Sequence, residues 1–178
     1  MTDTRPSSSN ICQPRSGTIR TAGRGLLGGL ALTLVAASAC GSDASGPDCA
    51  DAIENTVEAA TFAASLNVDV SALTKNNANV YFQDITVGSG PLAEPGDAVR
   101  MEYTGWFTDG TVFDAGTFDF IIGLGQVIIG WDRGIEGMQL GGRRLLVLPP
   151  SVGYGLCDAR GIPGNSILVF QVDLIEIF

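Results

Sequence analysis

The sequence contains no histidine among its 178 residues. This absence excludes the Ser-His-Asp and Cys-His nucleophilic arrangements and every metal site that uses imidazole ligands. Cysteine is also scarce, with 4 residues, and their spacing fits no Cys-x-x-Cys metal or redox motif. We therefore predict no metal and no cofactor, and the chemistry has to come from other side chains.

Basic residues are few, with 10 Lys and Arg against 19 Asp and Glu. Four of these cations lie in residues 1–39 beside a single carboxylate, which gives that segment a net charge of +3: Arg5, Arg15, Arg20 and Arg24 against Asp3. Without this segment, the net charge of the chain goes from −9 to −12. Because such a surface repels phosphate backbones, we expect no nucleic-acid binding.

Residues 1–39 have the pattern of an export signal. A basic start precedes the apolar run 26–37, which is too short to span a membrane as a helix. The run ends in Ala-Ser-Ala before Cys40, which resembles a bacterial lipobox, where the cysteine is lipidated and becomes the mature N-terminus. Ala37 departs from that motif, which usually has leucine there.

We therefore predict a lipoprotein signal peptide over 1–39 and an exported protein, held at the membrane of the cell envelope by acyl chains on Cys40. The alternative is an ordinary signal peptide that is cleaved after Ala39 and leaves Cys40 as a thiol. Residues 40–49 form a polar tether without a basic patch, so lipid anchoring would come from the acyl chains alone.

Residues 50–78 are predicted to form a short helical extension before the main domain. Ile53, Val57, Ala60 and Ala64 fall on one face of a helix over 50–64. This helix would either pack on the domain or form a dimer. Cys49 and Cys157 are the two cysteines of the exported body, and they are either one disulfide, which would attach the extension to the domain, or two separate thiols.

Residues 79–178 consist of short segments of strand pattern separated by turns. In 97–107, Val99, Met101 and Tyr103 alternate with polar residues, and Thr108–Gly110 has the composition of a hairpin turn. The last segment, 167–178, also alternates. Several hairpin-length strands and one helix predict an antiparallel sheet packed on that helix, an α+β fold.

The single helix is predicted within 123–144. Val127, Trp131, Ile135 and Met138 recur at helical spacing on one face. Three glycines interrupt this pattern at positions 130, 134 and 137, and each costs about 1 kcal/mol relative to alanine inside a helix. We interpret them as points of close approach between the helix and the sheet. By periodicity alone, Trp131 fits a plain core residue.

Five segments in collinear order resemble the FKBP-type peptidyl-prolyl cis/trans isomerases, the macrolide-binding immunophilins. They are EYTGWFTDGTVFDAG, FDF, GQVIIGWDRGIEGM, GGRRLLVLPPSVGYG and GIPGNSILVFQVDLIEI, which lie within 79–178. The resemblance implies a five-stranded antiparallel sheet wrapped around one short helix, with an aromatic pocket between them for a prolyl ring. It also implies proline-containing polypeptides as substrates and macrolides as inhibitors.

Carried over from the family, the pocket consists of Tyr103, Phe113, Asp114, Phe118, Val127, Ile128, Trp131, Tyr154, Ile162 and Phe170. The resemblance implies that Trp131 is the floor, with Tyr103, Phe118 and Phe170 as walls. Val127 and Ile128 would face the peptide, the latter through its backbone N–H. The catalytic positions would be Asp114, beside the twisting amide, and Tyr154, whose hydroxyl would reach a substrate carbonyl. Taken singly, each of these residues also fits a structural role.

The sequence departs from the family pattern in two places. Relatives often have a longer segment after the position of Asp114, with an arginine that pairs with this carboxylate. The present sequence lacks that segment, so Asp114 is expected to lack its usual partner. The loop after Tyr154 is short, contains Cys157, and has Gly164 where many relatives have a second proline. We expect this loop to affect substrate preference and macrolide affinity.

Three functions follow from these features. The first is a catalytic prolyl isomerase that assists the folding of exported or envelope proteins. The second is a non-catalytic module of the same fold, which acts as a membrane-anchored chaperone or adaptor. The third is a surface or solute-binding lipoprotein that shares only the fold.

Overall fold

The computed structural model describes residue 49 and residues 52–178. The predicted signal peptide over 1–39 and the lipidation of Cys40 lie outside the described residues, as does all of the tether over 40–49 except Cys49.

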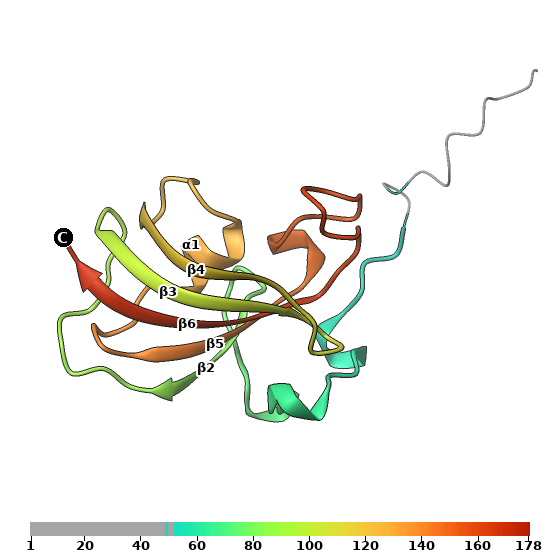
Figure 1. The fold of residues 1–178 in the computed structure, drawn as a ribbon, viewed down its shortest axis with the longest axis horizontal. Helices are drawn as coiled ribbons and strands as arrows, with labels where there is room; N and C mark the ends of the chain where they lie inside the picture. Colours follow the sequence, from blue (N-terminus) through green and yellow to red (C-terminus); the bar gives the residue numbers. More distant parts are fainter. Residues whose placement is uncertain (1–48, 50–51) are drawn as a thin grey trace, which may run out of the picture. The chain divides into compact units, whose positions relative to one another are not determined.

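A six-stranded antiparallel sheet forms the framework of the protein (Figure 1). Its strands are β1 (Thr74–Lys75), β2 (Tyr81–Thr86), β3 (Ala98–Phe107), β4 (Val112–Ile121), β5 (Arg143–Leu148) and β6 (Leu168–Ile177). The strands are ordered β1-β2-β5-β6-β3-β4. The five predicted strands are thus present, and the two-residue strand β1 is added at the edge beside β2. This arrangement confirms the predicted α+β class with an antiparallel sheet on one helix.

The one α-helix described, α1 (Ile129–Gly134), packs on one face of the sheet. It is only six residues long, so Val127 precedes the helix and Met138 follows it, contrary to the helical spacing read from the sequence. The helix begins after Ile128, whose backbone is extended, and the chain turns away after it at Gly137, which has a φ of +77° in the left-handed region. Trp131, Ile135 and Met138 still share one buried core with the sheet.

Glycines of the helix sit where the sheet comes closest. A Cβ on Gly130 would lie 2.5 Å from Cδ1 of Leu148, and one on Gly134 would lie 2.9 Å from Cδ2 of Leu146. Both leucines are fully buried strand residues. The close approach predicted for these two glycines is therefore confirmed, whereas Gly137 serves the backbone turn that follows the helix.

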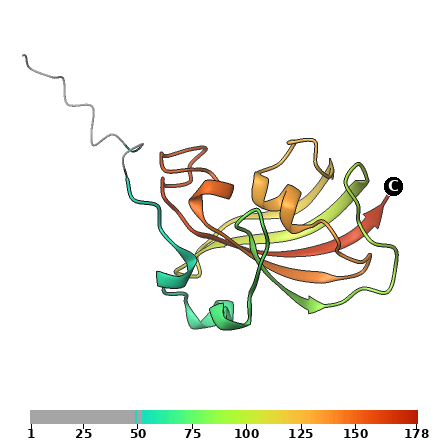
Figure 2. The same ribbon diagram turned by 180° about the vertical axis from the view of Figure 1, so that it is seen from behind.

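The opposite face of the sheet is covered by the N-terminal extension, as the two ribbon views show (Figures 1 and 2). Its second core contains these buried residues: Val57, Tyr81, Leu145, Val147, Ile167 and Val169. Half-buried side chains of the extension, including Phe62 and Leu66, pack against it. The extension therefore packs on the domain, as one of the two alternatives proposed.

The continuous helix predicted over 50–64 is not formed in the described part of that segment. The extension instead contains three single 3₁₀ turns, at Val57–Ala59, Ala64–Leu66 and Val70–Ala72, linked by extended backbone. Short turns let apolar side chains follow a long path over the sheet, whereas one regular helix would bury a single stripe. Burial against the sheet thus outweighs the local helical pattern.

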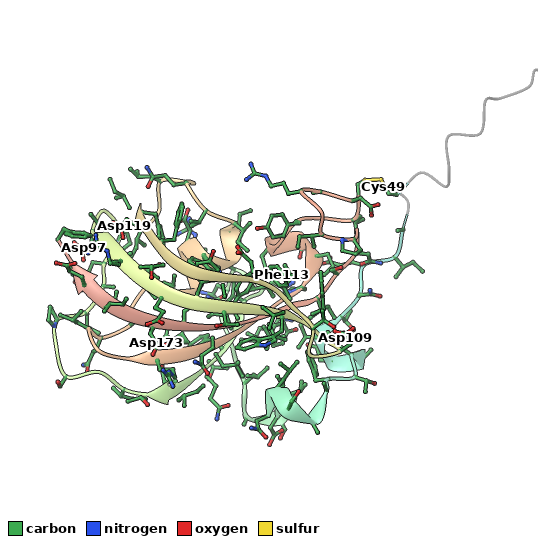
Figure 3. All side chains as sticks on the ribbon, viewed as in Figure 1. Cys49, Asp97, Asp109, Phe113, Asp119 and Asp173 are labelled. Atoms are coloured by element: carbon green, nitrogen blue, oxygen red, sulfur yellow. A yellow bond between two sulfur atoms is a disulfide. The ribbon has the colours of Figure 1, made fainter. Side chains whose placement is uncertain are left out.

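Cys49 and Cys157 are joined in a disulfide with a Cα–Cα distance of 5.2 Å (Figure 3). The extension is also bonded to the loop that carries Cys157. The backbone N–H of Asn55 donates to Oδ1 of Asn165 at 2.7 Å, and the backbone N–H of Ser151 donates to a carboxylate oxygen of Glu54 at 2.8 Å. Of the two alternatives left open by the sequence, the structure contains the disulfide.

Within residues 52–178, no helix has the length and apolar character that a membrane span requires.

Candidate functional site

A cavity of about 550 Å³ opens between α1, strands β3, β4 and β6, and the loop that follows β5. It is lined by Tyr103, Asp114, Phe118, Gly125, Gln126, Val127, Ile128, Trp131, Gly153, Tyr154, Arg160 and Phe170. Eight of the ten pocket residues carried over from the family are therefore brought together. Their origin in five separate segments of the chain explains why no local motif contains the whole site.

The floor of the cavity is the indole of Trp131, which is 5% exposed. The rings of Tyr103 and Phe170 meet it nearly at right angles, with centroid distances of 4.9 and 5.5 Å. Such edge-to-face contacts hold aromatic rings in fixed positions. The Nε1–H of Trp131 is buried without a hydrogen-bond partner among the described residues. The result is a rigid apolar cup with the dimensions of a small-ligand site.

Asp114 and Tyr103 form a hydrogen-bonded pair on one wall. The Tyr103 hydroxyl donates to Oδ2 of Asp114 at 2.8 Å, and the Ala115 backbone N–H donates to Oδ1 of the same carboxylate at 3.0 Å. Burial, and then the nearby carboxylate, raise the pKa of Tyr103 to about 12. Tyr103 therefore remains a proton donor at physiological pH, and Asp114 has a phenol as its partner in place of the arginine expected from the family.

The segment before the helix is held by the buried carboxylate of Asp132. Asp132 is 8% exposed, and its two oxygens accept from the backbone N–H groups of Gly123 at 3.1 Å and Gly125 at 2.9 Å. These bonds fix the loop that leads into Val127 and Ile128. Ile128 is the extended N-cap of α1, and its backbone N–H has no hydrogen-bond partner among the described residues.

Tyr154 lies on the opposite side, in the loop after the 3₁₀ turn Pro150–Val152. The backbone of this loop is fixed, because the Gly155 N–H donates to the Pro150 carbonyl at 2.9 Å and the Asn165 N–H donates to the Gly155 carbonyl at 2.9 Å. Within the described part of the chain, the Tyr154 hydroxyl makes no hydrogen bond. This hydroxyl and the Ile128 N–H are thus donors free to bind a ligand, in addition to the buried Nε1–H of Trp131.

Two predicted pocket residues support the site from behind instead of lining it. Phe113 packs edge-on against Phe170, with a centroid distance of 5.4 Å, and Ile162 is 7% exposed in the main core. The prediction missed Gly125, Gln126, Gly153 and Arg160, which line the cavity. Gln126 and the glycines lie inside motifs that were recognised, so their position in those motifs could have found them. Nothing in the sequence pointed to Arg160.

The described residues contain no group of three or more acidic or cysteine side chains that could hold a metal ion. The site combines an apolar cup for a ring, two hydrogen-bond donors for carbonyl oxygens, and a carboxylate bonded to a neutral phenol. This arrangement defines a binding site for an apolar ring next to a polar, planar group, such as an amide.

Comparison with known proteins gives the family. Residues 90–175 match the family described as FKBP-type peptidyl-prolyl cis-trans isomerase. The crystal structure of AtFKBP13 is similar with a TM-score of 0.54 and 33% identity, over 60% of this chain and 98% of that one. FkpA from Escherichia coli is similar with a TM-score of 0.55 and 32% identity, over 60% of this chain and 51% of that one. The chain belongs to the FKBP-type peptidyl-prolyl cis-trans isomerase family.

Curated relatives include fungal proteins. "FK506-binding protein 4" of Aspergillus oryzae is 47% identical over 102 residues, which are 55% of this chain and 22% of that protein. "Peptidyl-prolyl cis-trans isomerase" of Saccharomyces cerevisiae is 42% identical over 102 residues, which are 55% of this chain and 25% of that protein. The match thus spans no more than about a quarter of the length of these two relatives.

Proposed function

We propose that this protein is a peptidyl-prolyl cis/trans isomerase that acts on proline-containing polypeptides. The observation that carries the proposal is the aromatic cup over Trp131, with Tyr103 and Phe170 edge-on to the indole and the Asp114 carboxylate at its wall. A prolyl ring fits such a cup, and its preceding amide would then lie among the polar groups of the rim.

The reaction suits a site that has no strong base or nucleophile. Rotation about an X-Pro bond breaks no covalent bond, but it has to overcome amide resonance, with a barrier of about 18 to 20 kcal/mol. The twisted amide has lost resonance and charge separation, so it needs water less than the planar amide does. A dry aromatic pocket therefore binds the twisted form preferentially. Preferential binding of about 4 kcal/mol accelerates rotation a thousandfold.

Each group of the site then has a defined role in the proposal. Trp131 holds the prolyl ring and excludes water from it. The Ile128 N–H and the Tyr154 hydroxyl bind carbonyl oxygens of the peptide and keep its backbone fixed while the amide turns. Asp114 lies beside the rotating bond, and the neutral Tyr103 orients its carboxylate through the 2.8 Å hydrogen bond.

The chain offers a matched test, because it has two tryptophans. Trp131 forms the floor of the cup, whereas Trp106 packs against the second core on the other face of the sheet. Cis/trans exchange of a short X-Pro peptide should be measured by NMR with the wild-type protein and with Trp131→Leu and Trp106→Leu. We expect a large loss of kcat/KM only in Trp131→Leu, once each variant is shown to be folded. No acceleration by the wild type would refute the proposal.

A binding module with little turnover is the second candidate, and the rim of the cavity favours it. Phe118 is 46% exposed, Leu124 is 63% exposed and Ile129 is 56% exposed, around the cavity-lining residues 125–128. These apolar side chains suit contact with unfolded chains. Peptide binding without accelerated exchange in the same experiment would favour this candidate over the isomerase.

We also propose that the protein is exported and anchored to a membrane through lipidated Cys40, where it assists folding of exported or envelope proteins. The Cys49–Cys157 disulfide supports export, because such bridges persist in oxidising compartments. Mass spectrometry of the membrane fraction should find acyl groups on Cys40. An exported protein with an unmodified Cys40 would contradict the anchor but not the isomerase.

Macrolides are proposed as inhibitors of the same cavity. The support comes from the Aspergillus relative, which is named as an FK506-binding protein, and from the apolar cup. FK506 should reduce peptide exchange in proportion to its occupancy of the cup, and this occupancy is measured by fluorescence in Trp106→Leu, where Trp131 is the remaining tryptophan.

A further inference from the structure

Arg160 differs from the other basic residues that the structure describes. These number six, and four of them have a carboxylate within salt-bridge distance: Lys75, Arg100, Arg143 and Arg144. Arg133 and Arg160 have no such partner among the described residues. Of the six, only Arg160 lines the cavity. The cavity thus contains one cation whose charge is not neutralised by an ion pair within the described part of the protein.

The backbone holds Arg160 in a defined place at the rim. The N–H of Ala159 donates to the carbonyl of Ile162 at 3.0 Å, and the N–H of Ile162 donates back to the carbonyl of Ala159 at 2.9 Å. Arg160 and Gly161 form the two-residue turn between them, with φ values of +55° and +83°. Ile162 is buried in the main core. The turn is therefore anchored, and the guanidinium is attached to a rigid corner.

The two nearby acidic groups are already engaged. Asp114, the other charged residue that lines the cavity, accepts hydrogen bonds from the Tyr103 hydroxyl and from the Ala115 N–H. Asp158, two residues before Arg160, accepts from the Gly164 N–H at 2.7 Å. An anion brought in by a ligand is thus the natural partner for the guanidinium.

We infer that Arg160 makes the site prefer substrates with an acidic side chain within two residues of the proline. This inference rests on the proposed isomerase function and names the substrate class of that site. The chain as a whole is acidic, with a net charge of −9, and its overall electrostatic field disfavours such substrates. A local cation at the rim reverses this discrimination where the peptide lies. Because the pair is exposed to solvent, the expected gain in kcat/KM is about 1.5- to 5-fold.

The test compares peptides in pairs. Each pair carries either Glu or the isosteric Gln at one position within two residues of the proline, in an otherwise uncharged sequence. The ratio of kcat/KM for Glu over Gln is measured at low salt in the wild type, Arg160→Gln and Arg160→Lys. Arg133→Gln is the matched control, because it removes the other unpaired exposed arginine, which lies on α1 outside the cavity.

The electrostatic field of the acidic chain acts on the Glu peptide in every variant. Its effect therefore cancels when the Glu/Gln ratios of two variants are compared. We expect Arg160→Gln to lower the Glu/Gln ratio by about 1.5- to 5-fold at one or more positions. Arg160→Lys should retain most of the wild-type ratio, Arg133→Gln should retain all of it, and added salt should reduce it. An equal ratio in the wild type and in Arg160→Gln at every position would overturn the inference.

Failure of this inference can be distinguished from failure of the proposed function. If the wild type accelerates exchange in none of the peptides, isomerase activity is refuted. The same ratios are then taken from dissociation constants, measured for each peptide by fluorescence of Trp131 with Trp106→Leu present in every variant. A Glu/Gln affinity ratio that depends on Arg160 would uphold the charge preference for a binding module, and a ratio independent of Arg160 would refute it.

Discussion

Gly130→Ala tests whether the glycines of α1 are required by close packing. The new Cβ would lie 2.5 Å from Cδ1, 2.6 Å from Cδ2 and 3.0 Å from Cγ of Leu148. Because Leu148 is 0% exposed, its side chain can yield only by displacing other core residues. Alanine improves helix propensity by about 1 kcal/mol, whereas overpacking of a core costs about 1 to 3 kcal/mol. We expect a net loss of up to about 2 kcal/mol in the free energy of unfolding.

The assay is urea unfolding followed by tryptophan fluorescence, together with peptide exchange. The helix would be pushed away from β5, and Trp131, the next residue, would move with it. We therefore expect kcat/KM to fall in Gly130→Ala even where the variant is fully folded. A stabilised variant with unchanged activity would refute the packing argument, because the substitution would then act only by raising the helix propensity of this position.

A double-mutant cycle with Leu148→Ala sharpens this test. Leu148→Ala alone should lose about 2 to 5 kcal/mol, because it leaves a cavity under the helix. When Gly130→Ala is added to that variant, its new methyl group no longer clashes and partly fills the cavity, so the two losses should be far from additive. Gly137→Ala is the contrasting control. Its Cβ would meet nothing within 4 Å, but its φ is +77°, so its loss should come from backbone strain and should be independent of Leu148.

Three further changes test other parts of the structure. Cys49→Ser with Cys157→Ser should lower the free energy of unfolding by about 4 to 5 kcal/mol, since the bridge spans 108 residues; under reducing conditions this difference should vanish. Tyr103→Phe should reduce kcat/KM several-fold. The raised pKa of Tyr103, about 12, adds stability that is complete below pH 10 and is lost as the pH rises towards 12, so a pH series should show less alkaline destabilisation in the Phe variant. Asp132→Asn should destabilise the protein by about 1 to 3 kcal/mol and weaken peptide binding, because it disturbs the two N–H bonds that hold the loop before the helix; unchanged binding would contradict that role.

The alternating strands and the aromatic residues of the site were the predictable part. The alternation in 97–107 and 167–178 predicted β3 and β6, because side chains of these strands face the helix at every second position. Eight of the ten carried-over residues line the cavity, since the matched segments preserve the positions from which the strands and loops present them.

The interactions that depend on distant parts of the chain were not predictable from local pattern. The helix expected over 50–64 is replaced by 3₁₀ turns, because its apolar residues are buried by a sheet whose strands come later in the sequence. The Asp114–Tyr103 pair joins β4 to β3 across the sheet, and the sequence showed only that an arginine was absent. Arg160 reaches the cavity through a tight turn, which periodicity does not reveal.

The two buried faces of the sheet explain why Leu145–Leu148 is an unbroken apolar run. Leu146 and Leu148 face α1, and Leu145 and Val147 face the extension. The segment that matches the family begins at residue 90, after the extension has ended. A shortened chain with only that segment would lack β1 and β2. It would also expose the apolar side chains of Leu145, Val147 and Val169 to water. The unit that has to fold is therefore larger than the segment that matches the family, and any shortened version of this protein should begin no later than Cys49.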